Sequence, residues 1–247
     1  MAIPAAAGAL SFDQNITPDV IYGSGNANGG WTVDRQNGVE LGLRAKLRFD
    51  AANQPQNVFN SNGDGTYDYV AGQPPAGGFS FAPNSPSTAI WNFDWSVNTN
   101  FDGSTSLNLD DLTYVLSIDF DPGVVATNFL SFDPINIASP NFGDHAIGTN
   151  ATGNGGGTVA ADRPAYLVLL ANNNVAQNSW NMEFFDGGSF PFDGNDVGTY
   201  DFVLTAYNGS TPIASTSIQV NSIPEPSSGL LMGFGLLAFT ARRMRRT

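Results

Sequence analysis

The strongest constraint on the fold is a strict alternation of apolar and polar residues along several short stretches of the chain. In residues 39–49 every odd position is apolar, and the even positions between them are charged or Gly. Successive side chains of a β-strand point to opposite faces of a sheet, so a period of two predicts a strand with one face in a core. Residues 90–97 and 112–120 show the same alternation and are predicted to be strands for the same reason.

Turn residues separate the predicted strands. Residues 200–207 and 212–220 flank Asn208-Gly209-Ser210, and Asn-Gly favours the tight turn of a hairpin. Short strands are also expected at residues 31–33, 129–132 and 180–185, and a strand is expected to start at Asp110 and Asp111. One helix is expected at residues 164–172, and long loops are expected at residues 53–86 and 139–162. Eight or nine strands with Gly- and Asn-rich connections predict the all-β fold class, as a two-sheet β-sandwich or jelly roll over residues 10–220.

Composition limits the chemistry of this domain. The chain has no cysteine, which excludes disulfides, thiolate metal sites and a thiol nucleophile. Residues 1–223 hold five basic and 21 acidic residues, a formal charge of −16. Such a surface repels nucleic acid and anionic lipid, so neither is an expected partner. It favours solubility, repulsion between copies and capture of divalent cations.

The C-terminal tail has three parts in a fixed order. Residues 221–228 contain Pro224-Glu225-Pro226-Ser227, in which each Pro ends regular structure before it. Residues 229–241 carry no charge, and as a helix they would span about 20 Å, which is short for a hydrocarbon core of about 30 Å. Residues 242–247 hold the basic residues that would lie on the cytoplasmic side of a membrane, Arg242, Arg243, Arg245 and Arg246. These parts predict a sorting linker, a short transmembrane helix and an Arg-rich cytoplasmic end, and the alternative is an ordinary short anchor.

This tail resembles the PEP-CTERM sorting signal of Gram-negative bacteria that make extracellular polysaccharide, in which a Pro-Glu-Pro motif, a short hydrophobic helix and an Arg-rich end follow one another. The resemblance covers residues 223–247 and implies that a membrane-embedded exosortase cuts at or near the motif. Residues 10–220 also resemble the globular parts of other PEP-CTERM proteins, which implies no particular activity. We therefore expect an exported protein that is anchored briefly in the inner membrane and then reaches the cell surface or extracellular matrix.

Residues 1–9 are interpreted as the remnant of a signal peptide. Ala7-Gly8-Ala9 fits the small-residue pattern of a signal-peptidase site, but the basic and apolar regions that a signal peptide requires are missing. Export therefore predicts a further segment upstream of Met1.

One loop has the spacing of a calcium site. Oxygen-bearing side chains alternate along it, and Gly65 stands where the chain must turn sharply, as suits an ion that takes about six to eight oxygens. Ala71 stands where the EF-hand pattern has a bidentate Glu. The predicted ligands of a Ca²⁺ cofactor are Asn60, Asn62, Asp64, Thr66 and Asp68, and the alternative is a Gly-rich acidic hairpin loop. Further oxygen-rich candidates are Asp193-Gly194-Asn195-Asp196 and Asp119 with Asp121.

Two features are candidates for contact with polysaccharide or with another copy of the chain. Trp91 and Trp95 share a strand face and are expected in the core, whereas Trp180 follows a polar run and is a candidate platform for a sugar. A basic stripe lies on the polar face of the strand at residues 39–49 and comprises Arg44, Lys46 and Arg48. The stripe is expected either to pair with acidic residues on neighbouring strands or to dock against another copy or an anionic polysaccharide.

Enzyme signatures are weak, and we expect the protein not to be an enzyme. Glycoside hydrolysis needs two carboxylates that flank the scissile bond, and the spacing of the many aspartates selects no pair. His145 is the sole histidine and Asp144 could bias its protonation, but the sequence has no Gly-x-Ser-x-Gly elbow, so a structural role is favoured. The expected role is structural or binding, through adhesion or association with polysaccharide. The alternatives are a polysaccharide-acting glycoside hydrolase, a lectin-like carbohydrate-binding module and a membrane-tethered periplasmic module.

Overall fold

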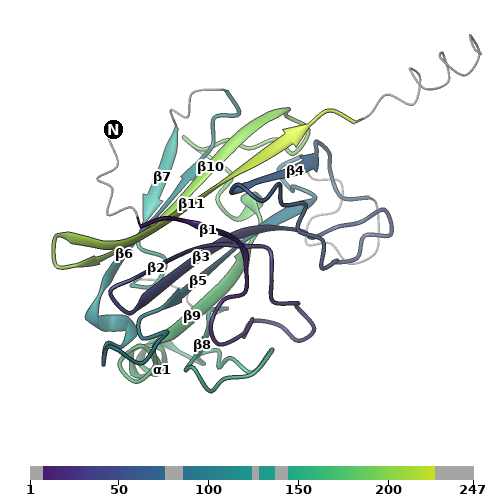
Figure 1. Cartoon of the computed structure of the whole chain (residues 1–247). Coiled ribbons are helices and arrows are strands. Elements are labelled where there is room, and N and C mark those ends of the chain that lie inside the picture. Colours follow the sequence, from purple (N-terminus) through teal and green to yellow (C-terminus); the bar gives the residue numbers. More distant parts are fainter. Residues whose placement is uncertain (1–7, 76–85, 124–127, 137–143, 226–247) are drawn as a thin grey trace, which may run out of the picture.

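The computed structural model of the 247-residue chain describes residues 8–75, 86–123, 128–136 and 144–225. They form two β-sheets packed face to face, which confirms the predicted all-β sandwich (Figure 1). The six-stranded sheet has the order β1-β2-β3-β5-β9-β8, with bounds Ser11–Gln14, Trp31–Gln36, Val39–Leu47, Trp91–Asn98, Val175–Trp180 and Ala146–Gly148. The five-stranded sheet has the order β4-β11-β10-β6-β7, with bounds Thr66–Val70, Thr211–Ile223, Gly198–Asn208, Thr113–Asp119 and Phe129–Phe132.

The two longest strands form the hairpin predicted around Asn208-Gly209-Ser210. β10 and β11 pair antiparallel along their whole length, and the register places Phe202 opposite Ile218. On its other side β11 pairs with β4, and this pairing is parallel. β11 is therefore an interior strand with a neighbour on each side, although the chain leaves the domain at its end.

Aromatic side chains fill much of the core between the sheets. Trp91 and Phe93 of β5 contact Phe202 of β10, with ring centroids 6.1 and 4.6 Å apart respectively. Trp91 and Trp95 are 2 % and 0 % exposed, which confirms that this face of β5 lies in the core. Each buried aromatic ring removes a large apolar area from water, so this layer contributes much of the hydrophobic stabilisation.

Two predictions of strand residues are wrong, because local side-chain hydrogen bonds form short 3-10 helices at residues 109–111 and 182–184. β9 ends at Trp180, because Asn181 accepts the backbone N–H of Glu183 at 3.3 Å and caps the short 3-10 helix η2 (Met182–Phe184). Asp110 and Asp111 do not begin a strand, because the Asp111 carboxylate accepts the N–H of Asn108 at 2.8 Å and closes the 3-10 helix η1 (Leu109–Asp111). The loops predicted for residues 53–86 and 139–162 contain β4 and β8 respectively.

The helix predicted near Pro164 is present as α1 (Arg163–Leu170). Asp162 caps it, since its carboxylate accepts the N–H of Ala165 at 2.8 Å. Within the described ranges, neither α1 nor any other helix combines the length and the apolar character needed to span a membrane. The helix predicted for residues 229–241 lies outside the described residues, as do residues 1–7 of the predicted signal-peptide remnant.

Residues 15–30, which we call the N-terminal strap, cover the outer face of the six-stranded sheet. The side chain of Gln177 on β9 accepts the N–H of Ile21 at 2.7 Å and donates to the carbonyl of Asp19 at 2.8 Å. A second buried cluster beneath and around the strap comprises Ile16, Val20, Ile21, Tyr22, Trp31, Val33, Ala146 and Val175. The polar face of this sheet is therefore buried, and the exposed face of the sandwich belongs to the other sheet.

Candidate functional site

The predicted sorting motif begins where the folded domain ends. β11 finishes at Ile223, whose carbonyl accepts the N–H of Ala71 at 2.8 Å, and the exposed Pro224 and Glu225 follow. This end of β11 lies at the margin of the sandwich (Figure 1). The rest of the predicted signal lies outside the described residues, namely Pro226, Ser227, Arg242, Arg243, Arg245 and Arg246. A cut beyond Glu225 would leave every described strand intact.

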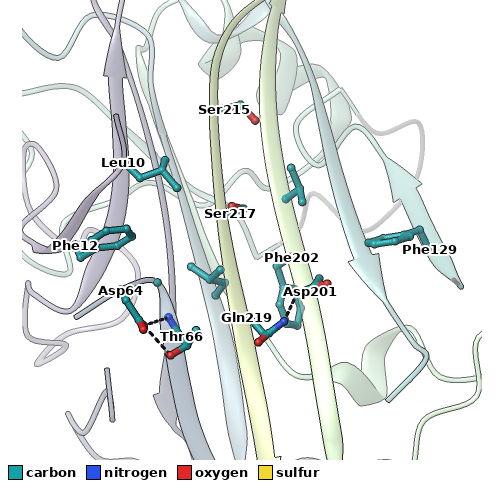
Figure 2. Close-up of a pocket in the computed structure, with 13 residues that line it drawn as sticks. Leu10, Phe12, Asp64, Thr66, Phe129, Asp201, Phe202, Ser215, Ser217 and Gln219 are labelled. Carbon is teal, nitrogen blue, oxygen red and sulfur yellow. Dashed lines mark hydrogen bonds between the residues drawn. The ribbon is translucent and has the colours of Figure 1, made fainter. Parts of the chain in front are cut away.

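A groove of about 520 Å³ lies on the outer face of the five-stranded sheet (Figure 2). Side chains of β10 and β11 form its floor, among them Asp201, Ser217 and Gln219. Phe12 of β1 stands on one side and Phe129 of β7 on the other, so a floor of polar side chains and Val203 lies between two aromatic rings. The alternation of apolar and polar residues in β10 and β11 predicts that their outward side chains are exposed, but it does not predict a groove. The sequence analysis therefore missed this site.

Carboxylates of neighbouring strands meet beside this groove. Asp201 accepts the side-chain amide of Gln219 at 2.9 Å, and the antiparallel register of β10 with β6 brings it next to Asp119. Burial raises the pKa of Asp119, and the nearby charges of Asp201 and Asp121 raise it further. The hydrolase alternative requires an exposed Trp beside two facing carboxylates, but all four tryptophans of the chain are buried.

The basic stripe predicted on β3 is not a surface feature. Arg44 and Lys46 are 0 % and 4 % exposed because the N-terminal strap covers them, and Arg48 is half-buried. The hypothesis that this stripe docks against another copy or an anionic polysaccharide is therefore wrong. The alternative of cross-strand pairing is confirmed for Arg44, whose Nε donates to the carboxylate of Asp94 at 2.7 Å directly across on β5.

Arg44 and Asp94 form the centre of a buried polar cluster under the strap. The guanidinium also donates to two strap carbonyls, each at 2.8 Å, and lies 4.3 Å from the centroid of the Trp31 ring. The hydroxyl of Tyr22 donates to Asp94. Burial alone would raise the pKa of Asp94, but the charges of Lys46 and Arg44 hold it below its ordinary value. These contacts all lie within the chain, so the cluster fastens the strap to the sheet.

Trp180, the candidate platform for a sugar, lies in the core. It is 5 % exposed and packs edge-on against Phe93, with ring centroids 6.0 Å apart. The ring of His145 lies 5.6 Å from it, and the Nδ1 of His145 lies 2.9 Å from the hydroxyl of Tyr166. A sugar could not stack on Trp180 without displacing these neighbours, so the prediction of a carbohydrate contact at this residue is wrong.

We expect His145 to make the protein less stable as the pH falls from about 7.5 to about 5. Burial lowers the pKa of His145 to about 4, whereas a histidine in an unfolded chain has a pKa of about 6.5. Between these two values the unfolded state binds a proton that the folded state does not. At about pH 5 this difference lowers the free energy of unfolding by about 2 kcal/mol.

Urea unfolding of the native sequence and of His145→Phe at the two pH values measures this contribution. The difference in unfolding free energy between the two proteins should shift by about 2 kcal/mol in favour of the variant at the lower pH. Burial also raises the pKa of Glu40 and of Asp119. Both groups titrate in the native protein and in the variant, so their contributions cancel in the difference between the two. Equal pH dependences of the two proteins would contradict the prediction.

Three of the five predicted calcium ligands lie on the turn before β4, Thr66 and Asp68 lie in β4 itself, and all five are bonded to other groups of the chain. The carboxylate of Asp64 accepts the N–H and the hydroxyl of Thr66, at 3.0 and 2.7 Å. The amides of Asn60 and Asn62 donate to the carbonyl of Asp68 and to the hydroxyl of Thr66, each at 2.9 Å. The carboxylate of Asp68 accepts an amide of β11 at 2.7 Å. In the part of the chain that the structure describes, no three His, Cys, Asp or Glu residues gather as metal ligands.

We expect EDTA to leave the melting temperature unchanged, because hydrogen bonds within the chain close this turn. The measurement is differential scanning fluorimetry with Ca²⁺ and with EDTA. A rise in melting temperature that requires Ca²⁺ would contradict this expectation and support the calcium site predicted from the sequence.

The remaining oxygen-rich candidates also use their carboxylates in turns. Asp193 accepts the backbone N–H and the side-chain amide of Asn195, at 2.9 and 2.7 Å. Asp119 accepts the N–H of Asp121 at 3.0 Å. These bonds shape the loops that follow β6 and precede β10.

Comparison with protein-family models matches residues 222–246 to the PEP-CTERM protein-sorting motif. Comparison with curated proteins and with solved structures finds no match. The matched residues begin in the last two residues of β11 and cover all but the first and last residue of the three-part tail. They mark the chain for export and for sorting by a membrane-associated exosortase. The chain thus carries a PEP-CTERM protein-sorting motif, and a two-sheet β-sandwich precedes it.

Proposed function

We propose that the protein is exported, is cut from its tail by an exosortase-type enzyme, and then takes a structural or binding role at the cell surface or in the extracellular matrix. The position of the motif directly after β11 carries this proposal. The last strand ends at Ile223, and the described sandwich is complete before Pro226. Removal of the tail therefore costs the folded domain none of its described strands.

The charge of the domain fits such a role. Residues 1–223 carry a formal charge of −16, which keeps copies apart and soluble once the tail has been removed. The core is filled by buried aromatic side chains, including Trp91, Trp95 and Trp180. A rigid acidic domain of this kind is suited to presenting a surface to other matrix components.

Intact mass spectrometry of the protein recovered from cells and from the medium tests this proposal. We expect the mature protein to end near Pro224-Glu225-Pro226, and we expect the full tail to persist in cells that lack the exosortase. A matched control is the same chain with Glu225→Gln, which separates recognition of the motif from general proteolysis of an exposed linker. A surface-located protein that keeps Arg242 to Thr247 would contradict release and would support a permanently tethered module.

A further inference from the structure

The two outer faces of the sandwich differ in a way that points to a binding surface. The strap covers the outer face of the six-stranded sheet, and the polar residues there bond to the strap. On the five-stranded sheet the described residues leave the outward side chains of β10 and β11 half-exposed, in regular alternation with buried ones. We propose that the groove on this face binds a neutral polysaccharide chain. This inference rests on the proposed function, because it names the ligand class of a matrix protein.

The floor of the groove belongs to a sheet face rich in hydroxyl groups. Neighbouring strands pair these groups across the sheet, with Ser117 and Ser131 2.8 Å apart and Thr205 and Ser215 2.9 Å apart. A hydroxyl has one donor and two acceptor positions, so Ser215, which lines the groove, keeps hydrogen-bonding capacity toward a ligand. Ser217 lies in the middle of the groove floor (Figure 2). A surface of this kind matches a ligand that carries many hydroxyl groups of its own.

The sides of the groove supply apolar contact. Phe129 is 37 % exposed at one side, and Phe12 is half-buried at the other (Figure 2). A sugar ring presents C–H groups on its faces and hydroxyl groups around its edge. The apolar faces can pack against the phenyl rings while the hydroxyl groups reach the floor.

The charges around the groove disfavour an anionic ligand. Asp64 and Asp201 line it, and Asp119 lies beside Asp201. The five basic residues upstream of the tail lie on other elements, namely β2, β3, the residues after β3, and α1. An anionic polymer would be repelled here, whereas the carboxylate of Asp201 can accept hydrogen bonds from sugar hydroxyls.

Affinity electrophoresis of the full-length protein in native gels tests the proposal. The probes are two neutral polysaccharides, galactomannan and hydroxyethylcellulose, with anionic alginate as the comparison. We expect at least one neutral polysaccharide to retard the native protein, and alginate not to do so. Phe129→Ala and Ser217→Arg should each weaken the retardation about tenfold, because one removes a stacking ring and the other fills the floor with a long charged side chain.

Matched variants outside the groove control for charge and exposure. Phe184→Ala removes another exposed ring, and Ser106→Arg adds the same charge on an exposed loop, so both should be retarded like the native protein. Thermal melts of all variants confirm that each is folded. The proposal is overturned if neither neutral polysaccharide retards the native protein, if alginate retards it equally, or if the groove variants behave like their controls. The mass measurement of tail removal is independent of this assay, so either proposal can fail without the other.

Discussion

Replacing Asp94 with alanine should lower the free energy of unfolding by about 3–5 kcal/mol. Asp94 and Arg44 are both 0 % exposed, and their side chains are joined by a 2.7 Å hydrogen bond across β3 and β5. Without the carboxylate, the charges of Arg44 and Lys46 would remain buried side by side with no counter-charge, and Tyr22 would lose its acceptor. Urea unfolding followed by tryptophan fluorescence measures the change, and Asp196→Ala on an exposed turn is the control that should leave the free energy unchanged.

A double-mutant cycle separates the pair from simple loss of packing. Arg44→Met alone leaves Asp94 without its nearest charged partner, and Asp94→Leu alone leaves Arg44 without a counter-charge. The two substitutions together remove both charges of the pair. The double variant should cost less than the two single variants together, by a coupling energy of about 0.5–3 kcal/mol. Two results would show that the strap is held by its apolar contacts alone. One is that the effects of the single variants add strictly, and the other is that Asp94→Ala costs no more than the exposed control.

Phe93→Ala should lower the free energy of unfolding by about 3–5 kcal/mol. Phe93 is 0 % exposed, and its ring lies 4.6 Å from Phe202 of the opposite sheet and 6.0 Å from Trp180. Its removal opens a cavity between the sheets that these two rings cannot close without leaving their other contacts. Chemical unfolding measures the loss, and near-ultraviolet circular dichroism should show a changed environment of the tryptophans.

Phe129→Ala is the matched control for this prediction. The residue type and the substitution are the same, but Phe129 stands 37 % exposed at the side of the groove. Its loss should cost about 1–2 kcal/mol, clearly less than that of Phe93, because more than a third of its surface is already in water. Comparable losses in the two variants would mean that the aromatic layer between the sheets is not what holds them together.

Much of the sandwich could be predicted because its core residues alternate. The apolar positions of β3, β5 and β6 lie on the buried face as expected, and Asn208-Gly209 forms the expected turn of the β10–β11 hairpin. β9 was missed because half of its side chains, Gln177 to Ser179, are polar and stand in an unbroken run. Gln177 and Asn178 are nevertheless buried, since they bond to the strap and to Asp144.

The candidate sites were harder to predict, because a period of two does not say what covers the polar face. Arg44 and Lys46 alternate like residues of a solvent-facing stripe, and only the path of residues 15–30 buries them. The groove depends on segments distant in sequence, from Phe12 to Gln219, which no local pattern could bring together. The sorting motif could be predicted because its order of parts is local, and the family-model match at residues 222–246 confirms it.

The place of β11 in its sheet also determines how the domain responds to tension. The tail continues directly from β11, which pairs with β10 on one side and with β4 on the other. A pull on the tail while it is held in a membrane acts along this strand, so the ladder bonds on both sides share the load in shear and do not open one at a time. Forced unfolding is governed by the rate at which such a ladder yields. The sandwich is therefore attached to its tail at a point that resists mechanical extraction.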